Sequence, residues 1–214
     1  NNLRGDQPAK LGLTYEALAD VKPSIVCAHL SAYGRDNERA GWPGYDYLMQ
    51  AEAGYLSVTG EPEGPPARMG LSIVDFMTGL MTVFAMTSGI IGARASKQGM
   101  DVDVSLFDTA LHNLSYLAVW YLNQGHVQGR EARSGHPSLV PSQLYRTRDG
   151  WIFIMCNKEN FWAPLCERIG RPQWVTDARY ATFKARLENR VELGRLLDEA
   201  LSARTTAEWM SAFA

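Results

Sequence analysis

The sequence predicts an α/β fold in its first part, followed by a smaller α+β part. Stretches typical of strands alternate with stretches typical of helices up to about residue 124. This alternation indicates a parallel sheet covered by helices. A polar, glycine-containing stretch then precedes a hairpin signal and several helical segments. We therefore expect one domain at 1–124, a linker at 125–141 and a second domain at 142–214.

The expected elements rest on caps, chain breakers and runs of apolar residues. In the first domain they are a helix at 15–21, a buried strand at 24–31, a helix at 45–58 interrupted by Gly54, a loop at 60–66, a short strand at 71–74, a helix at 76–93, a strand at 101–104 and a helix at 106–122. The helix at 76–93 is apolar nearly all round, so we expect it to be buried. In the second domain, strands at 143–145 and 151–156 flank the turn signal Asp149-Gly150, and helices follow at 159–169, at 188–203 and from 206.

Composition limits the class of partner. Lysine and arginine total 21 against 23 for aspartate and glutamate, so the net charge is −2. A charge this small argues against nucleic acid or a membrane surface as the main partner. No run reaches the roughly eighteen uninterrupted apolar residues of a membrane span. The three cysteines have no CxxC spacing, which is typical of a reducing compartment, and we expect a cytoplasmic protein.

Both ends of the sequence are unusual. The chain opens at Asn1 without methionine, and it ends a few residues after the capping box formed by Thr205 and Glu208, which predicts the start of a helix. We expect the chain to be an internal fragment of a longer polypeptide.

The usual catalytic and metal-binding motifs are missing from the sequence. The four histidines have no ligand spacing with one another or with cysteine, so no metal site is predicted. There is no G-x-G-x-x-G, no Walker loop and no G-x-S-x-G elbow. His29 lies in an apolar strand, where a hydrogen-bonded core histidine is the expected role. Carboxylates remain as the candidates for chemistry.

Asp75 lies where the strand-like run at 71–74 meets the apolar helix. One interpretation is a helix N-cap, because its oxygen can accept hydrogen bonds from the first free N–H groups. Those groups and the helix dipole would also keep the carboxylate ionised. The other interpretation is a pre-oriented nucleophile, which is a recognised role for aspartate. This stretch alone favours the cap.

Two further sets of residues could contact a ligand. Tyr45 and Asp46 begin a helix, where Asp46 suits the dipole and Tyr45 could donate a hydrogen bond to an oxyanion or a substrate carboxylate. His136 lies in the expected linker, and clefts between domains often bind ligands. A plain loop residue is an equal alternative for His136.

An ordered set of motifs resembles the family III CoA-transferases, the CaiB/BaiF type that includes formyl-CoA and carnitine CoA-transferases. The matching pieces are NLRGD, LGLTYEAL, SAYG, WPGYDYLMQAEAGYLSVTGEPEGPPARMG, VDFMTGL, DVDVSLFDTAL and GHPSLVPSQLYRTRDGWIFI. They cover essentially the whole chain in order. The resemblance implies an interlocked homodimer whose subunits each have a Rossmann-like, parallel-sheet large domain and a small α+β domain. This chain would supply part of each domain.

The resemblance also implies a reaction. It places the catalytic nucleophile on Asp75, which would attack the thioester carbonyl of an acyl-CoA to give a mixed anhydride and CoA thiolate. The thiolate would then form an aspartyl-CoA thioester, and a small carboxylic acid would take the CoA by the reverse steps. Coenzyme A is thus expected as part of the substrate, with no tightly bound cofactor.

The same resemblance implies a set of CoA- and substrate-binding residues: Asn2, Leu3 and Arg4 in place of the family's Asn-Phe-Arg loop, a basic contact at Lys10, and the active-site tyrosine at Tyr45 with Asp46 after it. We also expect Leu106 and His136 to contact CoA or the substrate. Leu3 replaces the family's aromatic residue at its position. The SGHPSLV stretch stands where some formyl-CoA transferases carry a run of glycines, so the lid and the acceptor acid can differ.

Two alternatives stay open. The first is an enzyme like the α-methylacyl-CoA racemases or an isomerase, although Tyr45 stands where those racemases place a catalytic histidine. The second is a catalytically inactive CoA-binding module that kept the fold.

Overall fold

The computed structural model describes residues 1–214, and the chain divides into two compact units. The first unit comprises residues 1–59 and 66–129, and the second comprises residues 60–65 and 130–214. The last boundary, after residue 129, falls within the stretch expected to be a linker. The loop at 60–65, which was expected in the first domain, belongs to the second unit.

The first unit is built on a two-stranded parallel sheet. β1 (Val26–Ser31) pairs with β2 (Met100–Ser105), with the first residues of the two strands opposite each other. Parallel strands need a long crossover connection. Here the crossover contains α3 (Asp46–Glu52), α4 (Tyr55–Val58) and α5 (Ile73–Ser96). The predicted parallel sheet with helices is therefore confirmed.

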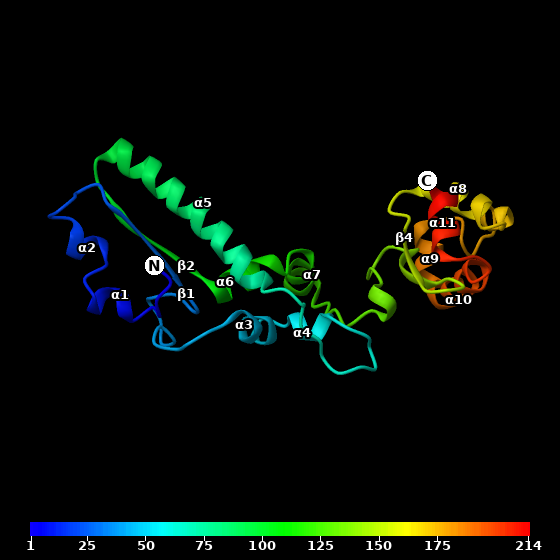
Figure 1. Cartoon of the computed structure of the whole chain (residues 1–214), viewed down its shortest axis with the longest axis horizontal. Helices are drawn as coiled ribbons and strands as arrows, with labels where there is room; N and C mark the ends of the chain where they lie inside the picture. Colours follow the sequence, from blue (N-terminus) through cyan, green and yellow to red (C-terminus); the bar gives the residue numbers. More distant parts are fainter. The chain divides into compact units, whose positions relative to one another are not determined.

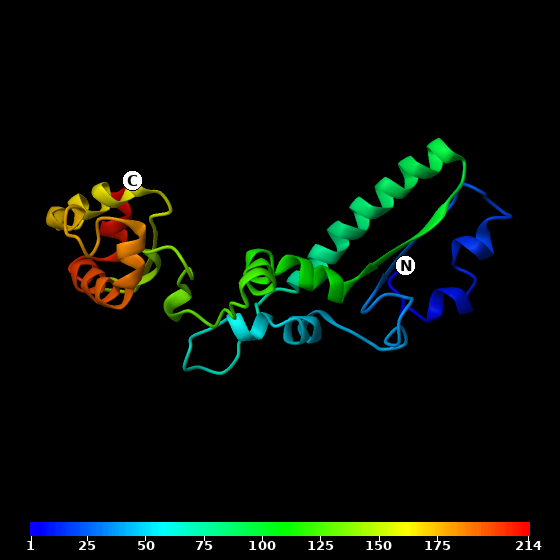
Figure 2. The same ribbon diagram turned by 180° about the vertical axis from the view of Figure 1, so that it is seen from behind.

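The long helix α5 runs along both strands, and α1 (Gln7–Lys10) and α2 (Tyr15–Leu18) lie on the other side of the strands in both views (Figures 1 and 2). Gly89 allows close packing, because a Cβ there would lie 3.0 Å from the Val102 side chain. The expectation that this helix is buried is wrong for much of its surface: four large side chains are 64–72% exposed, namely Phe76, Leu80, Phe84 and Ile91. Two strands and the neighbouring helices cover only one side of a helix that is apolar nearly all round.

By length and composition, α5 is also the one helix of this chain that could cross a membrane, and 17% of its most apolar window is buried. Core helices of soluble proteins have the same length and composition. The hydroxyls that interrupt its apolar sequence donate to carbonyls four residues earlier, as in the pairs Thr78 to Val74 and Thr82 to Thr78. These bonds satisfy the hydroxyls within the helix.

Two further expectations for the first unit are wrong. The residues at 71–74 form no strand, because α5 already begins at Ile73. The helix expected at 106–122 is two helices, α6 (Leu106–Asn113) and α7 (Tyr116–Gln124). They are separated at Ser115, whose φ of 53° is incompatible with a continuing right-handed helix. The predicted cap at the start of α6 is present, since Ser105 Oγ accepts from Asp108 N at 3.0 Å.

The N-terminal segment runs beside the free edge of β1. The amino group of Asn1 donates to Ala28 O at 2.8 Å, and Asn1 O accepts from Leu30 N at 2.9 Å. His29 is 1% exposed and forms hydrogen bonds with Asn1 through Nδ1 and with Asp101 through Nε2. His29 is therefore the hydrogen-bonded core histidine that was predicted. Because of these contacts, the next three residues, 2–4, lie at the carboxyl end of β1.

The second unit packs a hairpin against helices. β3 (Ser142–Arg146) and β4 (Trp151–Met155) pair antiparallel on either side of the predicted turn. The helical elements are η1 (Ala132–Ser134), η2 (Glu159–Phe161), α8 (Trp162–Arg168), η3 (Pro172–Val175), α9 (Phe183–Glu188), α10 (Arg190–Leu201) and α11 (Thr206–Phe213). The capping box of Thr205 and Glu208 is present at the start of α11, as predicted.

Candidate active site

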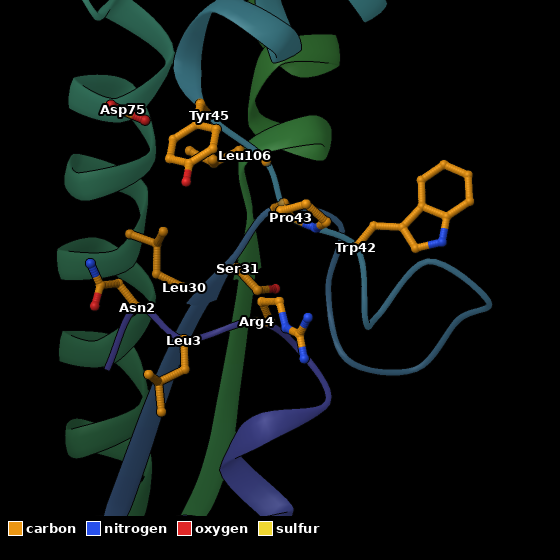
Figure 3. A pocket seen from close by; sticks show the side chains of 12 residues that line it. Asn2, Leu3, Arg4, Leu30, Ser31, Trp42, Pro43, Tyr45, Asp75 and Leu106 are labelled. Atoms are coloured by element: carbon orange, nitrogen blue, oxygen red, sulfur yellow. The ribbon is translucent and has the colours of Figure 1, made fainter.

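A cavity of about 580 Å³ lies in the first unit at the carboxyl end of β1. This is the end of a parallel sheet at which α/β proteins usually bind ligands. The lining comes from the N-terminal segment, the end of β1, the loop before α3 and the starts of α5 and α6: Asn2, Leu3, Arg4, Leu30, Ser31, Ala32, Trp42, Pro43, Gly44, Tyr45, Asp75 and Leu106. Figure 3 shows the Asp75 side chain extending from α5 toward the ring of Tyr45.

The cavity brings together six of the residues predicted from the sequence: Asn2, Leu3, Arg4, Tyr45, Asp75 and Leu106. Three predicted residues lie elsewhere. Lys10 is at the end of α1, outside the cavity lining. Asp46 is buried behind the lining. His136 belongs to the second unit.

Asp75 is the third residue of α5 and does not cap it. The N-cap position is Ser72, whose side chain makes no capping hydrogen bond. The cap comes from another helix, because Asp46 Oδ2 accepts from Val74 N at 2.7 Å and from Asp75 N at 3.1 Å. The interpretation of Asp75 as a helix cap is therefore wrong. Its exposed carboxylate is left at the cavity wall.

The electrostatic surroundings of Asp75 also differ from the expectation. Its partial burial raises the pKa of the carboxyl above its ordinary value, and the nearby charge of Asp46 raises it further. The helix N–H groups that were expected to favour the ionised form of Asp75 are bound by Asp46 instead. A carboxylate with a raised pKa is more basic, and therefore a better nucleophile once it is ionised.

The two predicted basic residues share one carboxylate. Lys10 Nζ lies 2.5 Å from Asp6 Oδ2, and Arg4 Nε lies 3.2 Å from Asp6 Oδ1. The hydrogen bond from Lys10 is the main reason that the pKa of Asp6 is lowered. Two cations and one carboxylate leave a net positive charge beside the cavity, which suits a phosphate or carboxylate ligand.

Tyr45 stands at the N-cap position of α3 and is 71% exposed. Gly44 before it is required by close packing, because a Cβ there would lie 2.4 Å from Ala32 Cβ. Sequence reasoning missed Leu30, Ser31, Ala32 and Trp42 as lining residues. The position of Ser31 at the end of a predicted strand of an α/β sheet was the available signal.

His136 holds a loop of the second unit. Its Nδ1 accepts hydrogen bonds from Ser138 N at 3.1 Å and Leu139 N at 3.2 Å. Burial lowers the pKa of the imidazole, which favours the neutral ring that can accept these bonds. No group of three or more metal-ligating side chains in residues 1–214 is arranged to hold a metal ion.

Comparison with known proteins gives a consistent result. The family model for CoA-transferase family III matches residues 1–214. An acyl-CoA transferase of Fusarium pseudograminearum is 37% identical over 99% of this chain and 46% of that protein. A succinate–glutarate CoA-transferase of Agrobacterium fabrum is 32% identical over 92% of this chain and 49% of that protein.

Solved structures agree with the sequence comparison. A CaiB/BaiF family protein from Brucella suis superimposes with a TM-score of 0.81 at 30% identity, over 99% of this chain and 55% of that one. The Mycobacterium tuberculosis protein Rv3272 superimposes with a TM-score of 0.86 at 30% identity, over 98% of this chain and 55% of that one. The chain spans about half the length of these relatives. The match over every residue, the shared fold and the relatives at 30% identity or more show that this chain belongs to CoA-transferase family III.

Proposed function

We propose that the protein transfers CoA from an acyl-CoA thioester to a small carboxylic acid, with Asp75 as the nucleophile. The observation that carries the proposal is the cavity that brings the Asp75 carboxylate together with Tyr45 and Arg4. Membership of CoA-transferase family III supports the reaction type.

In the first half-reaction, a carboxylate oxygen of Asp75 attacks the carbonyl carbon of the thioester. The carbon–sulfur bond breaks, the CoA thiolate leaves, and the acyl group is held on Asp75 as a mixed anhydride. The thiolate then attacks the aspartyl carbonyl and releases the first acid as a carboxylate. Asp75 is now an aspartyl-CoA thioester.

The second half-reaction reverses these steps with the acceptor. Its carboxylate attacks the aspartyl carbonyl and expels the thiolate, and the thiolate then attacks the acceptor's carbonyl in the new anhydride. This frees Asp75 and gives the new acyl-CoA without net uptake of a proton or of water. Each attack is fast only if the reacting groups are held in place and water is kept from the anhydride.

The neighbouring residues have roles that fit this scheme. The exposed hydroxyl of Tyr45 donates a hydrogen bond to the oxygen that becomes negatively charged during each attack. Arg4 and Lys10 attract the phosphates of CoA. Several relatives bear the names of small dicarboxylic acids, such as succinate, glutarate and oxalate. We therefore propose small dicarboxylic acids as the first acceptors to test.

The resemblance to family III enzymes also supports an active homodimer, and the free cysteines support a cytoplasmic location. Light scattering of the purified protein after size-exclusion chromatography tests the dimer. A monomer that carries full transferase activity would contradict it.

Trapping with hydroxylamine tests the nucleophile. The purified protein is incubated with succinyl-CoA and hydroxylamine, which converts either the anhydride or the aspartyl thioester into a hydroxamate. Peptide mass spectrometry should find the hydroxamate on Asp75, and the Asp75→Asn variant should show none. Full exchange in Asp75→Ala, together with an unlabelled Asp75 in the wild-type protein, would overturn the proposal.

The same preparation separates the two alternatives. Uptake of deuterium at the α-carbon of an acyl-CoA without any acceptor acid would identify a racemase-like enzyme. Binding of acyl-CoA with neither exchange nor labelling would identify an inactive binding module.

A further inference from the structure

We propose that Asp46 and Gln50 are positioning residues for the nucleophile: they hold the first turn of α5 and place a fixed negative charge behind Asp75. This inference rests on the proposed function, since it assumes that Asp75 is the group that reacts. Neither side chain lines the cavity, so both act through Asp75.

Asp46 and Gln50 form a buried polar clamp between α3 and the start of α5. They are four residues apart on α3 and therefore share one face of that helix. Asp46 is 4% exposed and Gln50 is 0% exposed. The clamp is held internally by a hydrogen bond of 2.6 Å from Gln50 Nε2 to Asp46 Oδ1.

The two side chains of the clamp bind different parts of the backbone leading to Asp75. Asp46 Oδ2 accepts from the backbone N–H groups of Val74 and Asp75. Gln50 binds the preceding loop on both sides, because its Oε1 accepts from Met69 N at 2.9 Å and its Nε2 donates to Leu71 O at 3.2 Å. The backbone of the nucleophile is therefore fixed from two directions. Positioning of this kind matters because a displacement of about 1 Å can cost about a hundredfold in rate.

The second contribution of the clamp is the negative charge of Asp46. Its hydrogen-bond partners are two backbone N–H groups and one amide, and none of them is a cation. Two other ionisable side chains line the cavity with Asp75, namely Tyr45 and Arg4, and the charge that acts on Asp75 is that of Asp46. Burial raises the pKa of Tyr55 in α4, and the charge of Asp46 raises it further. The negative charge of Asp46 makes Asp75 harder to ionise and more basic when ionised.

The test follows the rate of hydroxamate formation on Asp75 against pH, in the wild-type protein and in three variants. Asp46→Asn keeps an oxygen acceptor but removes the charge. The acid limb of the profile, where the rate falls as Asp75 becomes protonated, should therefore move to lower pH. The rate at the plateau above this limb should fall about 10- to 100-fold. Asp46→Glu keeps the charge with altered placement, so the plateau should fall while the limb stays at or above its wild-type position. Gln50→Met removes the hydrogen bonds to Met69 and Leu71, so the rate at the plateau should fall and the pH of the acid limb should stay unchanged. The KM for acyl-CoA should change little in all three, because the cavity lining is intact.

A purely structural role would lower stability without moving the acid limb. Glu16→Gln, an exposed carboxylate of the same unit, is the matched control and should leave the profile unchanged. Circular dichroism identifies any variant that fails to fold, in which case Asp46→Glu and Gln50→Met carry the test. An unchanged limb and plateau in Asp46→Asn, or an unchanged plateau in Gln50→Met, would overturn the proposal. An unlabelled Asp75 in the wild-type protein would instead overturn the proposed function.

Discussion

The two units of the chain bury their apolar side chains to different degrees. The second unit has a cluster of sixteen buried hydrophobic residues, contributed by its hairpin and helices. The buried cluster of the first unit has five members, and large apolar side chains of α5 are exposed. The first unit instead orders its chain through buried polar contacts, such as those of Asp46 and His29. The candidate active site lies in the unit with the smaller core, where hydrogen bonds place the reacting groups.

The largest effect should come from the cavity of the first unit. We expect Asp75→Asn to lower kcat/KM for CoA transfer by about a thousandfold or more, as for other catalytic side chains that act covalently. Folding should not suffer, because the folded-state pKa of Asp75 is raised above its ordinary value, so folding disfavours the ionised form at neutral pH. Enzyme kinetics and thermal melting measure the two effects. A large loss of stability with retained activity would contradict the assignment.

The next effect should come from a buried charge in the second unit. Arg186 is fully buried and donates to Val140 O at 2.9 Å, to Tyr180 O at 2.8 Å and to Glu159 Oε2 at 2.6 Å. Arg186→Met leaves these acceptors without their donor and should cost about 3–5 kcal/mol of unfolding free energy. Urea titration measures it. The control Lys184→Met, on the same helix and exposed, should change stability by less than about 0.5 kcal/mol.

A pair of truncations compares the two units directly. Leu197 is fully buried in the core of the second unit, so Leu197→Ala should cost about 2–5 kcal/mol. Phe84 is 71% exposed on α5, so Phe84→Ala should change stability by less than about 0.5 kcal/mol. Urea titrations of both variants provide the comparison. A loss of more than about 1 kcal/mol at Phe84 would show that this side of α5 is covered in the assembled protein.

A smaller loss of stability than at Arg186 or Leu197 should come from a helix cap. Thr205→Ala removes the hydroxyl that accepts from Glu208 N at 3.2 Å, and should cost about 1 kcal/mol. The reciprocal bond from Thr205 N to Glu208 lowers the pKa of Glu208. The contribution of that carboxylate is therefore present above its ordinary pKa and is lost as the pH falls through the lowered value. Thermal melting of Glu208→Gln against pH checks this. A difference from wild type that persists at low pH would contradict the assignment.

Local signals in the sequence predicted much of the fold. The cap at Ser105, the capping box at Thr205 and the turn at Asp149-Gly150 involve neighbouring residues, and all three are present in the structure, although Ser105 caps its helix without the reciprocal bond of a capping box. The failures involve distant contacts. The β-branched run before Asp75 looked like a strand, but the N–H of Val74 at its end is bound by Asp46 on another helix. The exposure of α5 also depends on which elements pack around it, and no pattern within the helix contains that information.

The candidate site was only partly predictable for the same reason. Its lining comes from five separate segments, and no motif spans them. The family resemblance supplied Asn2, Leu3 and Arg4, which composition alone would not have selected, whereas Tyr45 was already a candidate from its place at the start of a helix. The position of Asp46 behind the cavity could be found only from the structure.

The clamp between α3 and α5 also has a consequence for how the protein folds. The hydrogen bonds that the backbone N–H groups of Val74 and Asp75 donate to Asp46 join residues that are 28 and 29 positions apart in the chain. Contacts of such sequence separation form after the intervening loop has closed, which slows them relative to local structure. We therefore expect the first turn of α5 to gain its cap late, after α3 has docked. A newly made chain would form its secondary structure before Asp75 is held in its reactive position. The reactivity of Asp75 would therefore indicate that folding is complete.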